Sequence, residues 1–315
     1  SKGLESESSG TLTIGPACTV RSTDGTLFIG DGYFPGGSRT VTVQGTLEAD
    51  GLGASIQINP TTFSNLDAAG VLTGGTYRAL DRATIFMSRP IARNNATILV
   101  SGAGGSTTFI DSLGENAGSL TITGGRDVSA LALTGSPTAL VNSGTLVLGA
   151  GSRLTLGSGG RSADFTQTPA GLVRFELGGL DPNSGFGNLR VNGAANLDGT
   201  VAAAYVNGFP RQCGQVFQVI DANAQTGQFA ARDLPPVDDA TLFLMFYDGA
   251  DVRFSVSALA DFNQDGFLDF FDYDDFVACF EGTFCPPGVT ADFNRDDFVD
   301  FFDYDDFVFR FEAGC

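Results

Sequence analysis

One segment near the C-terminal end of this chain is written twice, and it constrains the fold more than any other feature. The first copy begins at Asp261 and the second at Asp292, an offset of 31 residues. Fourteen of the 17 aligned positions are identical. A match this close indicates a tandem duplication, so we expect the two copies to fold in the same way.

Each copy places acidic or amide side chains at positions 1, 3, 5, 9 and 12 of a 12-residue loop. This is the spacing of an EF-hand calcium loop, in which calcium takes about six to eight oxygen ligands and position 7 supplies a backbone carbonyl. We therefore predict two calcium ions. The predicted ligands are Asp261, Asn263, Asp265, Phe267 (carbonyl), Asp269 and Asp272 in the first loop, and Asp292, Asn294, Asp296, Phe298 (carbonyl), Asp300 and Asp303 in the second.

The two loops differ at position 6, where the chain must bend sharply. Gly266 permits that bend in the first loop, whereas the second loop has Asp297. Because Asp tolerates a left-handed backbone less well than Gly, we expect the second site to be weaker or more strained. Position 12 is Asp in both loops rather than the usual EF-hand Glu, so its shorter side chain must lie closer to the ion.

A helix is expected after each loop. Tyr273, Phe276, Val277 and Phe280 follow the i, i+3, i+4, i+7 spacing of one apolar helix face. The second copy repeats this pattern with Tyr304, Phe307, Val308 and Phe311.

A loop followed by one helix, duplicated and with Asp at position 12, resembles a type I dockerin over residues 261–312. The chain then ends in Glu-Ala-Gly-Cys. It is similar in this to Gly-Cys-type dockerin-anchored proteins, a group of secreted bacterial proteins. The resemblance implies export, surface association and docking to a protein partner, but no enzymatic activity.

Positions 10 and 11 of the loops carry part of the partner-recognition surface in the type I dockerin family. Here they are Phe270 and Phe271, and Phe301 and Phe302. That family generally has small or polar residues there, so a standard cohesin partner is in doubt. Two interpretations are open. The rings fill the module's own core, which we favour, or they are exposed and form a duplicated apolar patch for a partner.

The body before the module alternates short apolar and polar segments with Gly corners. Gly10–Ile14, Thr40–Val43, Ser119–Thr123 and Gly144–Leu148 show the period of two that is typical of strands. Loosely repeated strands without helical patterns favour a mainly β fold, a β-solenoid (parallel β-helix), with Thr and Ser outside and Leu, Ile and Val inside. A β-sandwich is the alternative.

Two stretches of the body, 65–77 and 142–156, resemble the β-helix repeats of autotransporter-type secreted proteins. We therefore expect a β-solenoid body over residues 1–162, a β-rich cap over 163–258 and the dockerin-like α-helical module over 259–315. The cap would cover an open solenoid end, because exposed strand edges invite aggregation.

The net charge of the chain limits the classes of molecule that it can bind. The net charge is −19, and the segment from Asp261 holds 15 of the 36 acids against two basic residues. A basic footprint for nucleic acid is absent, so nucleic-acid binding is disfavoured.

No apolar run is long enough to span a membrane. The chain has no His, which excludes His-based catalysis and His-ligated metal sites.

Five cysteines leave at least one without an intramolecular partner. Cys279 can pair locally with Cys285, or Cys285 can pair with Cys315, and the sequence does not decide between them. Cys18 and Cys213 have a simple alternative as buried small apolar residues. Disulfides and a calcium loop both suit an extracellular or cell-surface location.

Acidic residues in the body are the remaining candidates for catalysis. They are scattered, and no two share a strand at i, i+2 spacing: Asp67, Asp81, Asp111, Asp127, Asp164 and Glu176. We therefore expect a non-catalytic structural or adhesive protein that docks to a partner or to neighbouring copies, such as a filament subunit. The alternative is a carbohydrate-binding or carbohydrate-active β-helix tethered by its tail, with polysaccharide as a further partner class.

Overall fold

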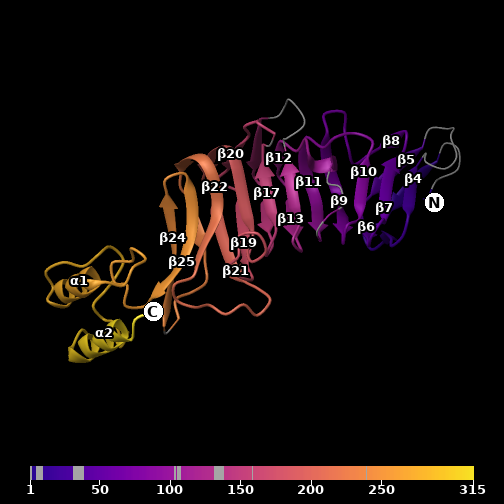
Figure 1. Cartoon of the computed structure of the whole chain (residues 1–315). Coiled ribbons are helices and arrows are strands. Elements are labelled where there is room, and N and C mark those ends of the chain that lie inside the picture. The colour runs from indigo at the N-terminus through magenta and orange to yellow at the C-terminus, as the bar shows by residue number, and fades with distance from the viewer. Residues whose placement is uncertain are drawn as a thin grey trace.

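The computed structural model describes residues 2–4, 10–30, 39–102, 104, 108–130, 138–157, 159–238 and 240–315. The fold is mainly β, with a β-solenoid of about seven turns and two C-terminal helices. The solenoid carries the helical module beyond one end, and the N-terminus lies at the other end (Figure 1). The predicted solenoid is thus confirmed, and the sandwich alternative is wrong.

Successive turns of the solenoid pair in parallel, so each sheet is built from strands far apart in sequence. One sheet contains β1 (Lys2–Leu4), β4 (Thr26–Gly30), β7 (Ser55–Asn59) and β10 (Thr84–Met87). A second contains β2 (Thr11–Ile14), β5 (Thr40–Val43) and β8 (Thr62–Phe63).

The third and largest sheet runs to the far end of the solenoid. The bounds of its first half are β3 (Thr19–Ser22), β6 (Thr46–Asp50), β9 (Val71–Leu80), β11 (Arg93–Ser101), β12 (Glu115–Asn116), β13 (Ser119–Thr123), β14 (Asp127–Ala130), β15 (Ala139–Asn142) and β16 (Thr145–Leu148). A short 3-10 helix, Thr108–Ile110, follows β11. The second half comprises β17 (Arg153–Leu156), β18 (Asp164–Gln167), β19 (Leu172–Leu177), β20 (Asn188–Leu197), β21 (Thr200–Tyr205), β22 (Val216–Gly227), β23 (Ala231–Asp233), β24 (Thr241–Asp248) and β25 (Asp251–Ala258).

Alternation along each strand explains why these segments stack. The register aligns inward apolar side chains in one column: Val20, Leu47, Tyr77, Ile98, Leu120, Leu146, Val173 and Val201. The residue before each is mostly Thr or Ser and lies on the outer face, as predicted. Because period two sends neighbours to opposite faces, a shift of one residue in any strand would expose this core.

A ladder of amides runs through the interior beside the apolar column. Asn94 donates to Asn116 at 2.9 Å, Asn116 to Asn142 at 2.8 Å, and Asn142 to Gln167 at 2.8 Å. The same amide groups also donate to backbone carbonyls of the next turn, such as Asn116 to Thr145. All four side chains are buried. Fully bonded buried networks of this kind fix one arrangement of their surroundings, and here they hold four successive turns in register.

The change from parallel to antiparallel pairing comes at the end of the body, next to the module. Parallel pairing continues past residue 162, through β23, so no change in strand pairing occurs at that boundary. The antiparallel part is β25, which pairs with β22 and with β24. The β24–β25 hairpin turns at Gly249–Ala250, between the paired residues Asp248 and Asp251, and Gly249 has a φ of +67°, as the first central residue of a type II′ turn requires.

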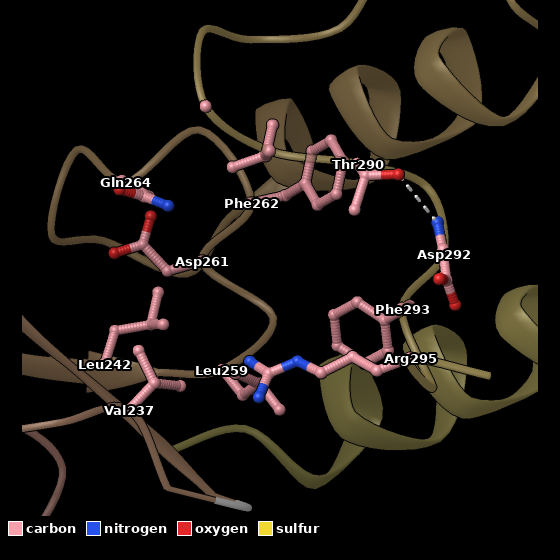
Figure 2. Close-up of a pocket in the computed structure, with 12 residues that line it drawn as sticks. Val237, Leu242, Leu259, Asp261, Phe262, Gln264, Thr290, Asp292, Phe293 and Arg295 are labelled. Atoms are coloured by element: carbon pink, nitrogen blue, oxygen red, sulfur yellow. Dashed lines mark hydrogen bonds between the residues drawn. The ribbon is translucent and has the colours of Figure 1, made fainter. Parts of the chain in front are cut away.

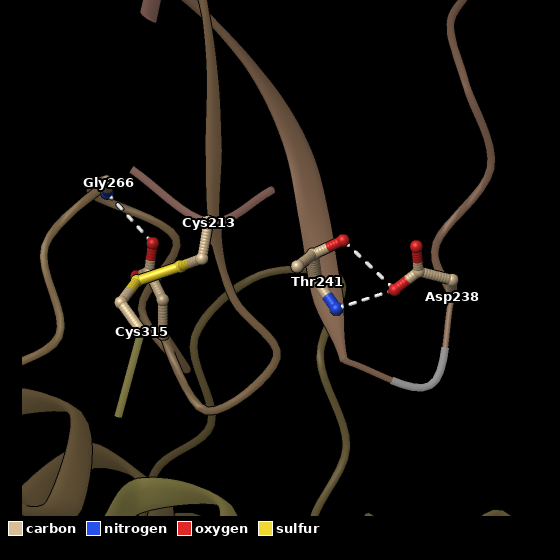
Figure 3. The surroundings of a disulfide bond; sticks show 6 residues. Cys213, Asp238, Thr241, Gly266 and Cys315 are labelled. Atoms are coloured by element: carbon tan, nitrogen blue, oxygen red, sulfur yellow. Dashed lines mark hydrogen bonds between the residues drawn. A yellow bond between two sulfur atoms is a disulfide. The ribbon is translucent and has the colours of Figure 1, made fainter. Parts of the chain in front are cut away.

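Two disulfides form, and one joins the module to the body. Cys279 pairs with Cys285, one of the two expected options. Cys213, between β21 and β22, pairs with Cys315 at a Cα–Cα distance of 5.2 Å (Figure 3). The Cys285–Cys315 option and the burial of Cys213 as a free residue are therefore wrong. Cys18 is unpaired and exposed rather than buried. In the part of the chain that is described, no helix has the length and apolar character needed to cross a membrane.

Candidate metal centre

The module contains two copies of one loop-helix unit. Helix α1 spans Phe270–Phe280 and helix α2 spans Phe301–Ala313. Each begins with a capping box, in which the position-9 and position-12 aspartates of the preceding loop bond reciprocally across the first turn. Both helices follow the predicted apolar pattern, and Phe276 and Phe307 are fully buried.

Equivalent residues of the two copies meet across the centre of the module. The rings of Phe276 and Phe307 stack at 3.9 Å with an interplanar angle of 6°. The hydroxyls of Tyr273 and Tyr304 lie 2.6 Å apart. Because the core is made of such pairs, each loop-helix unit depends on the other for its buried surface.

Both loops fold through the same side-chain to backbone hydrogen bonds. The Asp261 carboxylate accepts the amides of Asp265 (3.1 Å) and Gly266 (3.0 Å). Asp292 does the same for Asp296 and Asp297, each at 3.1 Å. These short-range bonds turn the backbone around the aspartates at position 1.

The position-12 aspartates close the loops from the other side. Asp272 accepts the amides of Asn263 (3.1 Å) and Asp269 (2.8 Å), and Asp303 accepts those of Asn294 (3.0 Å) and Asp300 (2.9 Å). Asp272 and Asp303 are fully buried although they lie on the first turn of exposed helices. Positions 1 and 12 of each loop are thus brought together by the backbone between them.

The pKa values of two aspartates in the first loop are raised. Burial, together with the nearby carboxylates of Asp272 and Asp265, raises the pKa of Asp261 to about 6, against the hydrogen bonds from Ser257 and Gly266 that lower it. Burial is also the main cause of a raised pKa for Asp272. Ionised carboxylates of like sign at a buried position disfavour the folded state unless a cation or hydrogen bonds compensate.

The donor set consists of carboxylate, amide and carbonyl oxygens, which are the ligands that a hard divalent cation prefers. Among the described residues, no group of three or more His, Cys, Asp or Glu side chains is gathered as it would be around an ion. The oxygen chemistry and the buried charge nonetheless fit a cation in each loop.

The two loops differ in their surroundings, and this difference could not be read from the spacing. Asp261 in the first loop is bonded by Ser257 of β25. A Cβ added to Gly266 would lie 3.1 Å from the Phe246 ring of β24, and Gly266 has a φ of +91°. In the second loop, Asp297 has a φ of +71° and is exposed. The first loop is therefore packed against the cap, whereas position 6 of the second faces solvent.

Replacing Gly266 by alanine is expected to destabilise the module by about 1–3 kcal/mol, because the new methyl meets Phe246 and the left-handed backbone strains any side chain. The matched change D297G is expected to be neutral or stabilising by up to about 1 kcal/mol, since Gly relieves the positive φ. Urea unfolding followed by circular dichroism measures both. Equal effects at the two positions would show that the packing against Phe246 is not what distinguishes the loops.

The four Phe side chains at positions 10 and 11 are exposed, and the core interpretation is wrong. Phe270, Phe271, Phe301 and Phe302 are 64–68% exposed. The ring of Phe270 stacks on that of Tyr273 with centroids 6.0 Å apart, and Phe301 stacks on Tyr304 in the same way. Phe270 and Phe301 share the helix phase of the core residues Tyr273 and Tyr304, whereas Phe271 and Phe302 do not, and all four rings lie on the first turn of their helices.

The acidic residues of the body are placed as separate surface or structural groups. Asp81 and Asp127 are exposed, and Asp111 and Glu176 are half-buried. Asp164 accepts the amide of Ala194. Asp67 accepts the amides of Ala69 and Val71 and lines two hollows together with Arg89.

No protein-family model matches this chain, and no curated protein matches it significantly. The resemblance to a dockerin therefore rests on the residues of the two loops.

Proposed function

We propose that this chain is an exported, non-catalytic structural or adhesive protein. In this proposal each loop of the module binds one calcium ion through the predicted oxygen ligands, as in a dockerin. The module docks the solenoid to a partner or to neighbouring copies outside the cell or at its surface. The observation that carries the proposal is the pair of loops with the same predicted ligand residues, each with two exposed aromatic rings beside it.

Several further observations support it. Two disulfides suit an oxidising compartment. The module's 15 acids against two basic residues favour cation binding. Exposed aromatic clusters are common at protein interfaces and rare elsewhere on soluble surfaces.

A carbohydrate-binding body is the second candidate. Three hollows on the solenoid share Arg89 and are lined in part by hydroxyl side chains such as Thr61, Ser64 and Ser112. A hydroxyl-lined surface with one guanidinium suits a polar, extended ligand. We place this candidate second because Asp67 is the one acidic residue, among those described, that lines these hollows.

Calcium is expected to stabilise the intact chain, and EDTA to abolish that gain. A cation that binds the folded state at 100 times its Kd adds about 2.7 kcal/mol per site. Thermal unfolding in CaCl2 and in EDTA measures this. D265N and D296N keep a hydrogen-bond acceptor for the amides of Phe267 and Phe298, so each is expected to reduce the calcium-dependent gain of its own loop.

The matched control is D274N, which removes the same charge from an exposed helix position outside the predicted ligands. It is expected to leave the calcium response unchanged. Unfolding temperatures that are equal in CaCl2 and EDTA would contradict the calcium proposal.

A further inference from the structure

Strand β24 has an unpaired outer edge. It pairs with β25 over its whole length, Thr241–Asp248, without a break in register, and no other described strand pairs with it. It lies at the outer edge of the cap, beyond β25 (Figure 1). Because alternate residues of an antiparallel strand bond to a given neighbour, half of the backbone groups of β24 point away from β25.

The hairpin turn shows which residues these are. A two-residue turn leaves Asp248 and Asp251 as a hydrogen-bonded pair, so the even-numbered residues of β24 bond to β25. The amide of Leu259 continues this pattern by donating to the carbonyl of Ala240 at 3.0 Å. The outward N–H and C=O groups therefore belong to Thr241, Phe243, Met245 and Tyr247.

The outward groups of Thr241 find partners within the chain, whereas those of the next three residues do not. Asp238 accepts from the amide of Thr241 at 2.7 Å and donates to its carbonyl at 3.3 Å. Among the described residues, no hydrogen bond reaches the outward backbone groups of Phe243, Met245 or Tyr247. Three donors and three acceptors thus form a row along one edge, which is a template for an added strand.

Strand β24 also lacks the features that usually protect such an edge. Its eight residues contain no Pro and no Lys, and none is charged before Asp248 at its end. Strand β23, which pairs with β21, is the contrast, because it has three residues and two of them are the exposed Arg232 and Asp233. Short charged edges resist strand addition, and long apolar edges invite it.

We infer that the outer edge of β24 pairs with the same edge of a second copy of this chain, antiparallel about a twofold axis at Met245. The three unpaired residues are symmetric about Met245, so Phe243 of one copy lies opposite Tyr247 of the other. Each copy supplies three donors and three acceptors, and this register satisfies all of them at once. The contact is isologous and stops at the dimer. It uses the body rather than the module and so goes beyond the proposed docking role.

The side chains of β24 fit the same register. Leu244 lies opposite Phe246 of the second copy, and both side chains are half-buried in the single chain. Pairing therefore removes more of their apolar surface from water. They share a face of the strand with Leu242, which lines the cavity of about 300 Å³ in front of Asp261 and the metal loops (Figure 2). The added strand leaves that cavity to the metal centre.

The charges at the two ends of β24 favour a second copy as the partner. Asp248 and Arg253 form an ion pair at 3.8 Å at the turn end of the strand, and Arg211 and Asp238 form one at 3.6 Å near its start. The antiparallel register brings the turn end of one copy to the start of the other, where the four charges balance. The Asp248 side chain is 73% exposed and can approach Arg211 of the second copy. Repulsion between the acidic modules is screened beyond about 8 Å in physiological salt.

Hydrogen exchange of the intact wild-type chain, across a concentration series in millimolar CaCl2 and physiological salt, tests the register without any substitution. The amides of Phe243, Met245 and Tyr247 are expected to exchange at least tenfold more slowly at high concentration than at low concentration. The amides of Leu244 and Phe246, which already bond to β25, are expected to change less. Sedimentation velocity of the same samples is expected to show a monomer converting to a dimer.

The variant L244K places a charge opposite Phe246 of the second copy and is expected to weaken the dimer at least tenfold. The matched control is L52K, the same change at a residue that is 77% exposed in the turn between β6 and β7. It is expected to dimerise like the wild type. Urea unfolding checks that both variants fold.

Three results would each overturn the inference. They are a wild-type chain that stays monomeric at every concentration, a dimer that leaves the three outward amides unprotected, and an L244K chain that dimerises as strongly as the wild type. Calcium-dependent stabilisation of the monomer in the same samples would leave the proposed function standing, so the two proposals can fail separately.

Discussion

Replacing Asn116 by aspartate is expected to be among the most destabilising single changes in the solenoid, at about 3–5 kcal/mol near neutral pH. Asn116 donates to Asn142 and Thr145 and accepts from Asn94 inside the core. A carboxylate has no proton for the first two bonds and adds an uncompensated buried charge. Urea unfolding of the intact chain measures the loss.

The matched control is N95D, the same chemical change on an exposed residue of strand β11. Asn95 accepts a hydrogen bond from Arg93 at 3.0 Å, which aspartate also accepts, so we expect a change within about 0.5 kcal/mol. Similar small losses for both variants would show that the ladder does not hold the turns together.

The loss of folding stability caused by N116D is also expected to depend on pH. Burial raises the folded-state pKa of the new carboxyl above the unfolded value of about 3.9. Ionisation therefore favours the unfolded state, and the penalty develops as pH rises above that unfolded value. Unfolding at pH 4 is expected to show a smaller difference from wild type than unfolding at pH 7.

Removing the Cys213–Cys315 disulfide with C213A/C315A is expected to have the second large effect. This bond closes a loop of 102 residues that contains the cap and the whole module. Chain entropy of the unfolded state predicts a loss of about 4.7 kcal/mol for a loop near this length. The Cys279–Cys285 bond closes only six residues, for which the same relation gives about 2 kcal/mol.

C279A/C285A is therefore the control, and urea unfolding of both variants under non-reducing conditions is the measurement. We also expect C213A/C315A to release the module to proteolysis between β25 and loop 1, because the linker at Ala258–Ala260 becomes its one covalent tie to the body. A smaller loss for C213A/C315A than for C279A/C285A would contradict the entropic account.

The local geometry of the two loops was predictable because the bonds that make it are short in sequence. Asp261 bonds residues four and five positions ahead, and Asp272 bonds residues nine and three positions behind. Residue types at fixed spacing suffice to specify such bonds. The helices were predictable for the same reason, since their apolar faces follow the helical period.

The exposed rings at positions 10 and 11 show where helical period stops being informative. Phe270 is three residues before Tyr273 and shares its phase, yet its ring is exposed. The position of a residue in the helical period gives the direction in which its side chain points. Burial also requires a neighbouring element that covers the side chain at that point along the helix. Nothing in the described structure covers the ring of Phe270, and the spacing within one helix cannot show this.

The amide ladder escaped prediction for a related reason. Its members are separated by 22, 26 and 25 residues. Turns of unequal length hide the repeat, so Asn94, Asn116 and Asn142 read as ordinary polar residues in three unrelated strands. Their alignment appears only when parallel pairing places one above another.

The duplicated stretch itself fixed two loops, two capped helices and an oxygen-only set of candidate ligands, because each depends on neighbours within about ten residues. Tertiary structure decided the rest. It placed Cys213 beside Cys315, packed the Phe246 ring against Gly266, and left the four Phe rings outward with a cavity on another face. These features depend on where the last turn of the solenoid ends. That position is set by the stacking of all the turns before it, which residue spacing within the duplicated stretch does not contain.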